Sequence, residues 1–390
     1  MKTVRIGYIP LVDAAIPIVA AECGFAEAAG IKIELVREVS WSNIRDKLLL
    51  DLFDAAHMLA PLAVATSLGF GHIKDPLIAP FALNTNGNCI TIAASLYRSL
   101  AELLGHEPAN ALESARAMGL LIKQRKRIGA EPLTFGVVFP YSVHAILIRH
   151  WLRLGGVDVQ HDVQFLVVPP PYMATSLSKG VIEGYCVGEP WNSRAVETGV
   201  GCIAAFGAEI AAHSPDKMLG LRGKWAEDNP DTLKRLLRAL KAAALWCESE
   251  ANHESLAGLL AQSRYLNVAP RTIMRTFAGK LAVTPTQTRP EPEFINLGRG
   301  QINRPDPRQA LWVYAELTHL LGRPVRREEA RVAASVFRRD LFDEAIGEPE
   351  EPESPDAIAL TYGPAFDSND LQAYLDTIRG TPNAERAIKD

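Results

Sequence analysis

The amino-acid sequence predicts an α/β protein with two lobes. Its 390 residues are more than one hydrophobic core usually holds. Short apolar runs bounded by Gly or Pro alternate with helical patterns through much of the chain, which predicts mostly parallel sheets with crossover helices. The stretch Thr134–Trp191 shows this alternation over a short length. We therefore expect it to form the sheet of a second, smaller lobe, with a small-anion pocket where its strand ends and helix tops converge.

The first ninety residues predict most of the sheet of the first lobe. The strand VRIGYIP is followed by an Ala-rich helix with Pro17 in its first turn and Gly24 at its end. The alternating run IKIELVREV predicts a half-exposed strand, and Ser40 is a candidate cap for the helix after it. Further strands and one helix are expected in the segments FDAAHM, PLAVATSLG, LIAPFAL and CITIAAS.

The rest of the chain returns to the first lobe after the stretch Thr134–Trp191. Helices are expected over 230–262, 270–280, 306–322 and 327–344, with a last one in SNDLQAYLDTIRG. The acidic, Pro-rich segment 347–356 predicts an exposed linker. The predicted division is 1–90 plus 190–390 for the first lobe and 91–189 for the second. The chain would cross between them near Cys89–Ser95 and Val187–Trp191, which would form a hinge.

The composition excludes several classes of protein. A net charge of −4 argues against a broad nucleic-acid surface, and no run has the length of a membrane helix. The five cysteines are scattered without a C-x-x-C pair, which predicts reduced thiols and no metal site. No signal-peptide pattern precedes the first strand, so we expect a cytoplasmic protein.

His144 is the first candidate for ligand binding. It lies in the first turn of the predicted helix SVHAILIRHWL, on the same face as Leu147, Ile148 and Trp151. A polar side chain there points toward the helix N-terminus, where free N–H groups attract an anion. The alternative is a core histidine bonded to a nearby carbonyl, and the sequence leaves both open.

Other candidates are weaker taken singly. Trp41 could donate its indole N–H at the lobe boundary or pack in the hinge, and Asn88 could donate an amide or serve a turn. Lys217 would be a permanent cation if it entered the cleft. We expect Glu189 to be a structural hinge carboxylate and His57 to be packed at a strand end. Nucleophile elbows, phosphate loops and dinucleotide motifs are absent from the sequence.

Several segments together resemble the substrate-binding proteins of nitrate and bicarbonate ABC transporters, the NrtA/CmpA type. These segments are SWSNIRD, FDAAHMLAP, LNTNGN, the helix opening with His144, VVPPP, YCVGEPW and PDKMLGLRGKW. The resemblance covers roughly residues 4–260 and implies a type II periplasmic-binding-protein fold, with no cofactor, no metal and no enzymatic activity. It also implies the ligand-binding residues, which are Trp41, Asn88, His144, Pro170, Val187, Gly188 and Lys217. Asn88 stands where these relatives have Gln.

The resemblance also suggests a ligand. Bicarbonate can donate a proton and would suit a carboxylate at position 217, whereas nitrate and nitrite need only donors, so Lys217 favours nitrate or nitrite. Without an export signal, the chain is most similar to NasS, a cytoplasmic nitrate/nitrite sensor that sequesters an RNA-binding antiterminator of the NasT type until the anion binds. The alternative is the receptor of an ABC transporter for nitrate or, less favoured, bicarbonate. A pyrimidine-forming enzyme on the same fold is a third hypothesis, but no reactive lysine or Cys/His cluster supports it.

Overall fold

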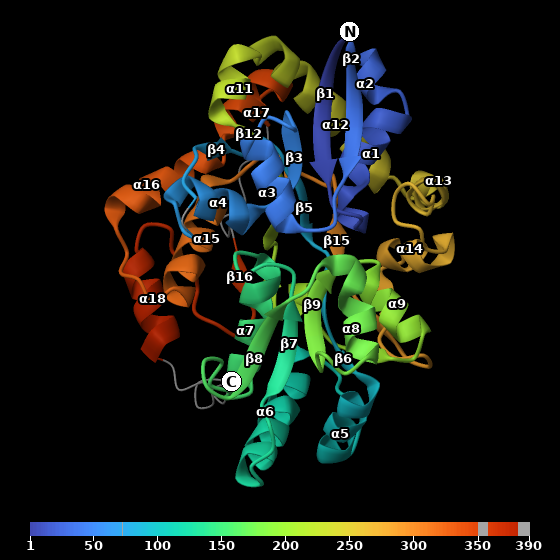
Figure 1. Ribbon diagram of the computed structural model, residues 1–390, viewed down its shortest axis with the longest axis vertical. Coiled ribbons are helices and arrows are strands. Elements are labelled where there is room, and N and C mark those ends of the chain that lie inside the picture. Colours follow the sequence, from blue (N-terminus) through green and yellow to red (C-terminus); the bar gives the residue numbers. More distant parts are fainter. Residues whose placement is uncertain (72, 350–357, 381–390) are drawn as a thin grey trace.

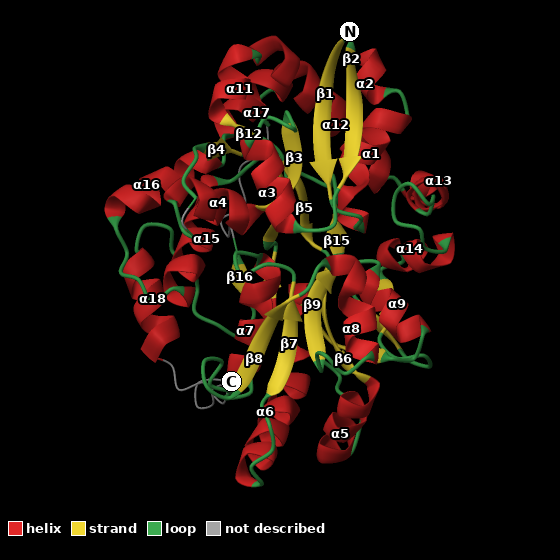
Figure 2. Cartoon of the chain, viewed as in Figure 1, coloured by secondary structure: helices red, strands yellow, loops and turns green. Residues whose placement is uncertain are grey.

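Two separate β-sheets form the centres of two lobes in a computed structural model of the chain. The structure describes residues 1–71, 73–349 and 358–380. In Figure 1 the strands β1, β2 and β3 lie in the upper lobe and β6, β7, β8 and β9 in the lower one. Helices lie on the outside of both sheets (Figure 2). The upper lobe is called the first lobe below and the lower one the second lobe.

The sheet of the first lobe has seven strands and is mixed. Its spatial order is β15 (Ile295–Asn296), β5 (Ala82–Asn86), β12 (Pro215–Arg222), β3 (Ala55–Leu59), β1 (Lys2–Tyr8) and β2 (Ile31–Arg37), with β4 (Leu77–Ile78) paired to β12. Strand β1 runs parallel to β2 and β3, whereas β12 is antiparallel to β3 and β5. The carboxyl ends of β1 and β3 therefore point toward the second lobe, where ligands of such sheets bind.

The sheet of the second lobe has five strands. Their order is β10 (Gly201–Phe206), β6 (Asn88–Ala93), β9 (Gly184–Gly188), β7 (Leu133–Val137) and β8 (Val163–Val167). The chain enters this sheet directly after Gly87, whose φ of 87° lets β5 turn into β6. It leaves after Phe206, because β10 pairs with β6, and this is later than the predicted crossing at Val187–Trp191. The division of the chain into domains stays a prediction.

Two helices begin or end at the residues that the sequence predicts. The Ser40 hydroxyl accepts a hydrogen bond from the Asn43 N–H (3.2 Å) at the start of α3 (Trp41–Leu49). Helix α4 (Ala60–Leu68) carries Pro61 in its first turn and ends at Gly69, whose φ is 76°. The other helices of this half are α1 (Ala15–Glu22) and α2 (Phe25–Ala28).

The second lobe is covered by six helices among the described residues. They are α5 (Ala94–Leu104), α6 (Ala111–Arg127), α7 (Val143–Leu154), α8 (Met173–Ser178), α9 (Trp191–Glu197) and α10 (Gly207–Ile210). Helix α7 is the predicted His144 helix, and its apolar face is buried through Leu147, Ile148 and Trp151. The Ser142 hydroxyl caps it by accepting from the Ala145 N–H (3.1 Å).

The long helix expected over 230–262 is two helices. Helix α12 ends at Glu248 and α13 (His253–Leu260) follows a short 3-10 turn, because Ser249 has an extended backbone (ψ 120°) that a helix cannot continue. The predicted helix over 327–344 is likewise divided at Phe337. The remaining elements of this part are α11 (Gly223–Asp228), α12 (Pro230–Glu248), α14 (Pro270–Phe277), α15 (Pro307–Leu320), α16 (Arg327–Val336), α17 (Arg339–Ile346), α18 (Leu371–Gly380), β11 (Ala211–Ala212), β13 (Lys280–Ala282), β14 (Thr288–Pro290) and β16 (Ala359–Leu360).

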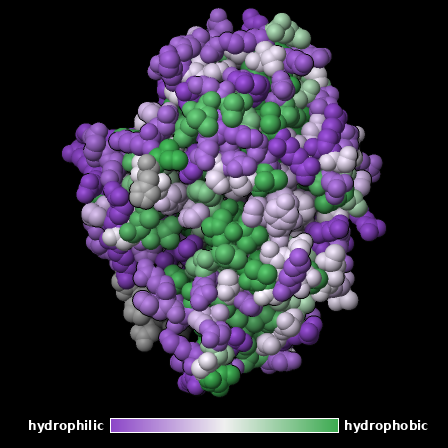
Figure 3. All heavy atoms as spheres, viewed as in Figure 1, coloured by the Kyte–Doolittle hydropathy of each residue, from purple (hydrophilic) through white to green (hydrophobic). Residues whose placement is uncertain are grey.

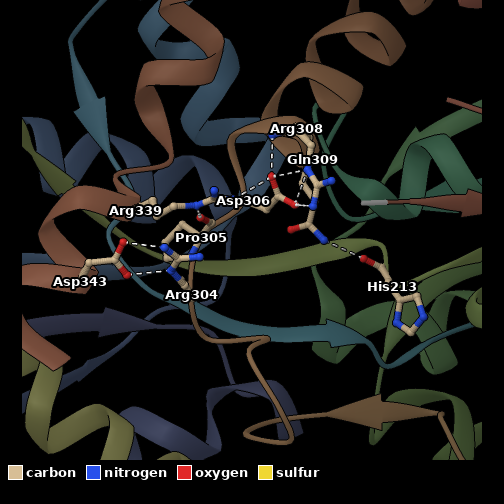
Figure 4. Close-up of polar contacts among 8 residues, drawn as sticks. All are labelled: His213, Arg304, Pro305, Asp306, Arg308, Gln309, Arg339 and Asp343. Carbon is tan, nitrogen blue, oxygen red and sulfur yellow. Dashed lines mark hydrogen bonds and ion pairs between the residues drawn. The ribbon is translucent and has the colours of Figure 1, made fainter. Parts of the chain in front are cut away.

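Ion pairs and hydrogen bonds hold the segment before α15 against α17 and against His213. Arg304 donates two 2.7 Å hydrogen bonds to the Asp343 carboxylate of α17, and Asp306 caps α15 by accepting from the Arg308 N–H (Figure 4). Gln309 donates to the His213 carbonyl (3.1 Å). The predicted acidic linker at 347–356 lies mostly outside the described residues. None of the described helices is long and apolar enough to cross a membrane.

Polar contacts join the two lobes at several places in the described part of the chain. The Glu189 carbonyl accepts from the Val12 N–H (2.8 Å), and the Trp191 indole donates to the Pro10 carbonyl (3.2 Å). On the side where α15 lies, His150 Nε2 of α7 is 3.0 Å from the Glu316 carboxylate of α15. Glu189 is buried and accepts from the Ser193 N–H (3.1 Å), so it has the structural hinge role that the sequence predicts.

Candidate functional site

Lys217 of β12 is fully buried between two carboxylates at the lobe boundary. Its ammonium lies 2.9 Å from Asp13 Oδ2 and forms an ion pair with its neighbour Asp216. Adjacent strand residues normally face opposite sides, but the pairing of β12 with β5 shifts register on both sides of Lys217. This bulge re-aims the backbone, so that Asp216 and Lys217 meet.

Asp13 is held on its other side by His57 of β3. The two side chains approach to 2.9 Å between His57 Nε2 and Asp13 Oδ1, and both are buried. The Ile9 N–H faces His57 Nδ1 at 3.5 Å, so the neutral tautomer carries its proton on Nε2, toward Asp13. His57 is thus packed at a strand end as expected, and it also supports the lysine's partner.

These contacts set the ionisation of Asp13 and Lys217. Burial alone would raise the pKa of Asp13, but the charge of Lys217 and the contact with His57 outweigh it and hold that pKa well below its usual range. Burial likewise works to lower the pKa of Lys217, and the two carboxylates reverse this, so the net direction is upward. Asp13 is therefore an anion and Lys217 a cation at neutral pH.

Trp41 forms a wall of the same cluster. It is the first residue of α3, with its ring centroid 5.6 Å from Lys217 Nζ and 5.4 Å from the His57 ring. The ring is 1% exposed, which allows a cation–π contact with the lysine. Its indole Nε1 is buried and has no hydrogen-bond partner within the described part of the chain.

Asn88 brings a second unpartnered group from the other lobe. It starts β6 and pairs with Gly188 of β9, and neither polar atom of its amide has a partner among the described residues. A Cβ at Gly188 would lie 3.0 Å from Asp13 Oδ2 and 3.7 Å from Asn88 Oδ1. The glycine therefore lets the backbone of the second lobe approach the carboxylate of the first.

His144 occupies the first turn of α7 and is fully buried. Both of its ring nitrogens lack hydrogen-bond partners in the described ranges, so the carbonyl-bonded alternative is wrong for this structure. Burial lowers the pKa of His144 to about 4, with Asp216, Lys217 and Asp13 as the charges that act on it. The imidazole is therefore neutral at pH 7, with one donor and one acceptor free.

The remaining predicted residues line the second lobe. Val187 and Gly188 are buried at the end of β9, and the Val187 carbonyl accepts from the Asn192 amide (2.8 Å). Pro170 is buried at the start of the 3-10 turn after β8. Its carbonyl accepts from the Met173 N–H. No polar contact among the described residues joins Pro170 to the Lys217 cluster.

The site is closed to solvent in this conformation. Trp41, Asn88, His144 and Lys217 are each at most 1% exposed. On the face shown in Figure 3, hydrophilic residues lie mostly at the edges and hydrophobic residues gather over the centre. An anion can reach the buried donors only if the lobes separate, and the hinge contacts at Val12 and Trp191 lie where such a motion would pivot.

The charge balance around Lys217 includes two acidic residues that the sequence argument did not consider. Two carboxylates, Asp13 and Asp216, flank one ammonium, so these three groups sum to one negative charge. The sequence argument for nitrate over bicarbonate is that position 217 is a lysine and not a carboxylate, and the structure adds two carboxylates beside that lysine. Among the described residues, no group of three His, Cys, Asp or Glu side chains is placed to hold a metal ion.

Comparison with known proteins gives the family. The model described as the NMT1-like family matches residues 1–261. The chain belongs to this family. One relative of this chain is the bicarbonate transport ATP-binding protein CmpC of Synechococcus elongatus. It is 32% identical over 383 residues, which is 96% of this chain and 54% of CmpC. The chain thus spans about half the length of the curated relatives it matches first.

Other relatives match over most of their own length. The nitrate/nitrite binding protein NrtA of Synechococcus elongatus is 28% identical over 97% of this chain and 86% of its own. The crystal structure of the periplasmic nitrate-binding protein NrtA from Synechocystis PCC 6803 superposes with a TM-score of 0.87, at 26% identity, over 97% of this chain and 98% of that one. The resemblance to the NrtA/CmpA type and the predicted type II periplasmic-binding-protein fold are therefore confirmed.

Sequence reasoning missed two acidic residues of the cluster. Asp13 lies outside the segments that carry the resemblance, and Asp216 lies in PDKMLGLRGKW beside Lys217 but was not chosen as a site residue. Asp13 had one usable signal, because it follows closely on the carboxyl end of β1, the position where α/β sheets bind ligands. Asp216 had its place beside Lys217 as a signal, but adjacent strand residues normally face opposite sides and its direction depends on the bulge in β12.

Proposed function

We propose that this NMT1-like chain is a binding protein for nitrate or nitrite and serves as the receptor of an ABC importer. The observation that carries the proposal is the set of buried, unpartnered polar groups contributed by both lobes, namely Trp41 Nε1, the Asn88 amide and the His144 ring. Buried polar groups are normally paired, so we infer that a bound ligand supplies the hydrogen-bond partners of these groups. The names of the NrtA relatives support nitrate or nitrite as that ligand.

The proposed ligand is a small planar oxyanion. Trp41 belongs to the first lobe and Asn88 and His144 to the second, so an anion between them would be bonded from both sides and would favour the closed state. Lys217 adds a positive charge beneath the Trp41 ring. The proposal includes binding without chemistry, which agrees with the description of the NrtA relatives as binding proteins.

Calorimetric titration with sodium nitrate, nitrite and bicarbonate tests this function. Heat with nitrate or nitrite, saturating at one anion per chain, is expected, together with its loss in Lys217→Glu. Bicarbonate is the competitor to watch, because the unpartnered Asp216 Oδ1 could accept its hydrogen. Binding of bicarbonate alone, or of none of the three anions, would contradict the proposal.

A cytoplasmic sensor of the NasS type is the second candidate. The favouring observation is that all five cysteines are free and four are buried, which suits a reducing compartment. In this case the closed form would release a NasT-type antiterminator. Co-purification with such a partner, lost when nitrate is added, would support the sensor. A complex that ignores nitrate, or no complex, would leave the receptor as the function.

A further inference from the structure

The buried cluster already holds a net negative charge before any anion enters. Asp13 and Asp216 contribute two negative charges and Lys217 one positive charge, all at or below 2% exposure. A nitrate ion placed among them would bring a second uncompensated negative charge into a solvent-excluded site. Burying an unpaired charge is costly, and the usual response is a change of protonation.

His144 is the group that can supply the missing positive charge. It is buried beside the cluster, and its two ring nitrogens have no partner in the described chain. A neutral imidazole offers an anion one donor, whereas an imidazolium offers two. Nitrate and nitrite carry only acceptors and a negative charge. The imidazolium suits them better, because it has a positive charge and a second N–H donor.

We propose that His144 takes up one proton when the anion binds, so that nitrate or nitrite and a proton enter the site together. The inference rests on the proposed function, since it concerns the same ligand and cleft. Protonation would bring the site with its anion to the same net charge of −1 that it has empty, because the imidazolium balances the nitrate. The proton is thus a co-ligand of the anion.

Two further titratable groups lie close by, His57 against Asp13 and Glu189 directly after β9, and the variants described below separate them from His144. The other neighbours of α7 are already charged, paired or protonated. On β12, Lys217 is already charged and Asp216 is bonded to it, and the contacts of Asp13 with Lys217 and His57 hold its pKa down. Strand β9 contributes the thiol of Cys186, whose pKa burial raises. Helix α10 contributes Glu209, which pairs with Arg289. The side facing α6 is neutral, where Trp151 donates to the Ser114 hydroxyl (3.0 Å).

The sign of the pH dependence follows from linkage. The empty site keeps His144 neutral above about pH 4, since burial lowers its pKa to about 4. A bound anion raises the pKa of His144. The affinity for the anion is therefore highest at low pH, and it falls as the pH rises from the His144 pKa of the empty protein to that of the anion complex. Within that window the Kd for nitrate should increase by about tenfold per pH unit.

Calorimetry in buffers of different ionisation enthalpy measures the proton directly. Nitrate is titrated into the whole protein at one pH, near 6, in about three buffers. The observed enthalpy should change with the buffer's ionisation enthalpy, with a slope near one proton taken up per anion. A slope of zero in the wild-type protein, with nitrate bound, overturns the inference and leaves the proposed function standing. Absence of nitrate binding overturns both.

Two variants assign the proton. His144→Gln keeps a hydrogen-bond donor but cannot titrate, so its slope should be zero and its Kd independent of pH. His161→Gln is the matched control, because His161 lies exposed on the second lobe, paired with Asp158, and its slope should equal that of the wild type. Uptake that persists in His144→Gln overturns the assignment. Should that variant not bind, the imidazole signal of His144 in nitrate-saturated wild-type protein decides, by showing or lacking a raised pKa.

Discussion

The two walls of the cleft are built differently. The wall of the first lobe is charged and largely satisfied internally, through the chain of contacts from His57 to Asp13 to Lys217 to Asp216. The wall of the second lobe is uncharged, and its amide and imidazole have no partners among the described residues. Trp41 has features of both walls. Its ring packs on Lys217 of the charged wall, but its indole N–H has no partner among the described residues.

This difference separates stability from affinity. Removing a member of the charged chain leaves a buried ion without its partner, which should destabilise the folded protein. Removing an unpartnered donor costs the empty protein little and should weaken only the ligand complex. Unfolding and anion binding therefore report on different walls of the cleft.

The largest effect is expected for Lys217→Met. The change leaves Asp13 and Asp216 as two buried carboxylates without a cation, so the free energy of unfolding should fall by about 3–5 kcal/mol and nitrate binding should disappear. Urea unfolding at pH 7 measures the loss. Lys224→Met is the control, because the Lys224–Asp228 pair is exposed and its removal should not change stability measurably. An unfolding curve of Lys217→Met that matches wild type would refute the charged-wall description.

Next in size is Trp41→Phe. The phenyl ring still fills most of the space, but the indole donor is lost, so the Kd for nitrate should rise roughly tenfold to a hundredfold. The matched control is Trp151→Phe, whose indole has a partner in Ser114 and lies away from the cleft. This second variant should lose stability and keep its Kd. Equal losses of nitrate affinity in the two variants would show that an unpartnered indole N–H contributes no more to anion binding than a paired one.

Glu189, at the junction of the two walls, gives a pH-dependent prediction. Burial raises its pKa from the ordinary 4.5 to about 7, so its stabilising contribution is full below about pH 4.5 and is lost as the pH rises through about 7. Glu189→Gln lacks this loss. Thermal or urea unfolding should show the variant gaining about 2 kcal/mol on wild type between pH 5 and pH 8. A difference that does not vary with pH would mean that the carboxyl is ionised throughout.

The smallest effect is expected for Asn88→Gln. The longer amide reaches about one methylene further into the site, so the Kd for nitrate should fall by roughly threefold to tenfold. Stability should stay within about 0.5 kcal/mol, because the Asn88 amide has no hydrogen bond to another described residue that the change would break. Calorimetry on both proteins gives the answer. Weaker binding by the Gln variant would show that the pocket is already filled by the shorter side chain.

Much of the fold could be predicted because its signals are local. The Ser40 cap, the Pro61 and Gly69 boundaries of α4 and the apolar face of α7 are each decided by neighbouring residues, and each is observed. The break at Ser249 and the place of β10 in the second sheet were not predicted. Both depend on tertiary packing, which can divide a helical pattern and can assign a strand to either of two sheets.

The site shows the same division. Trp41, Asn88, His144, Gly188 and Lys217 could be proposed because rare sequence segments carry them. Their partners could not, because Asp13 meets Lys217 across more than two hundred positions of chain, and Asp216 turns inward only through a bulge. Sequence reasoning therefore proposes candidate residues, which stay a prediction, and does not reach the carboxylates that surround the lysine.

A crystal structure of the protein grown with sodium nitrate tests the central claim most directly. The account predicts a planar anion between the lobes, with its oxygens within hydrogen-bond distance of Trp41 Nε1, the Asn88 amide and a ring nitrogen of His144. Lys217 should keep its contacts with Asp13 and Asp216. A cleft that holds only water at saturating nitrate, or an anion bound elsewhere with these three groups still unpaired, would contradict it.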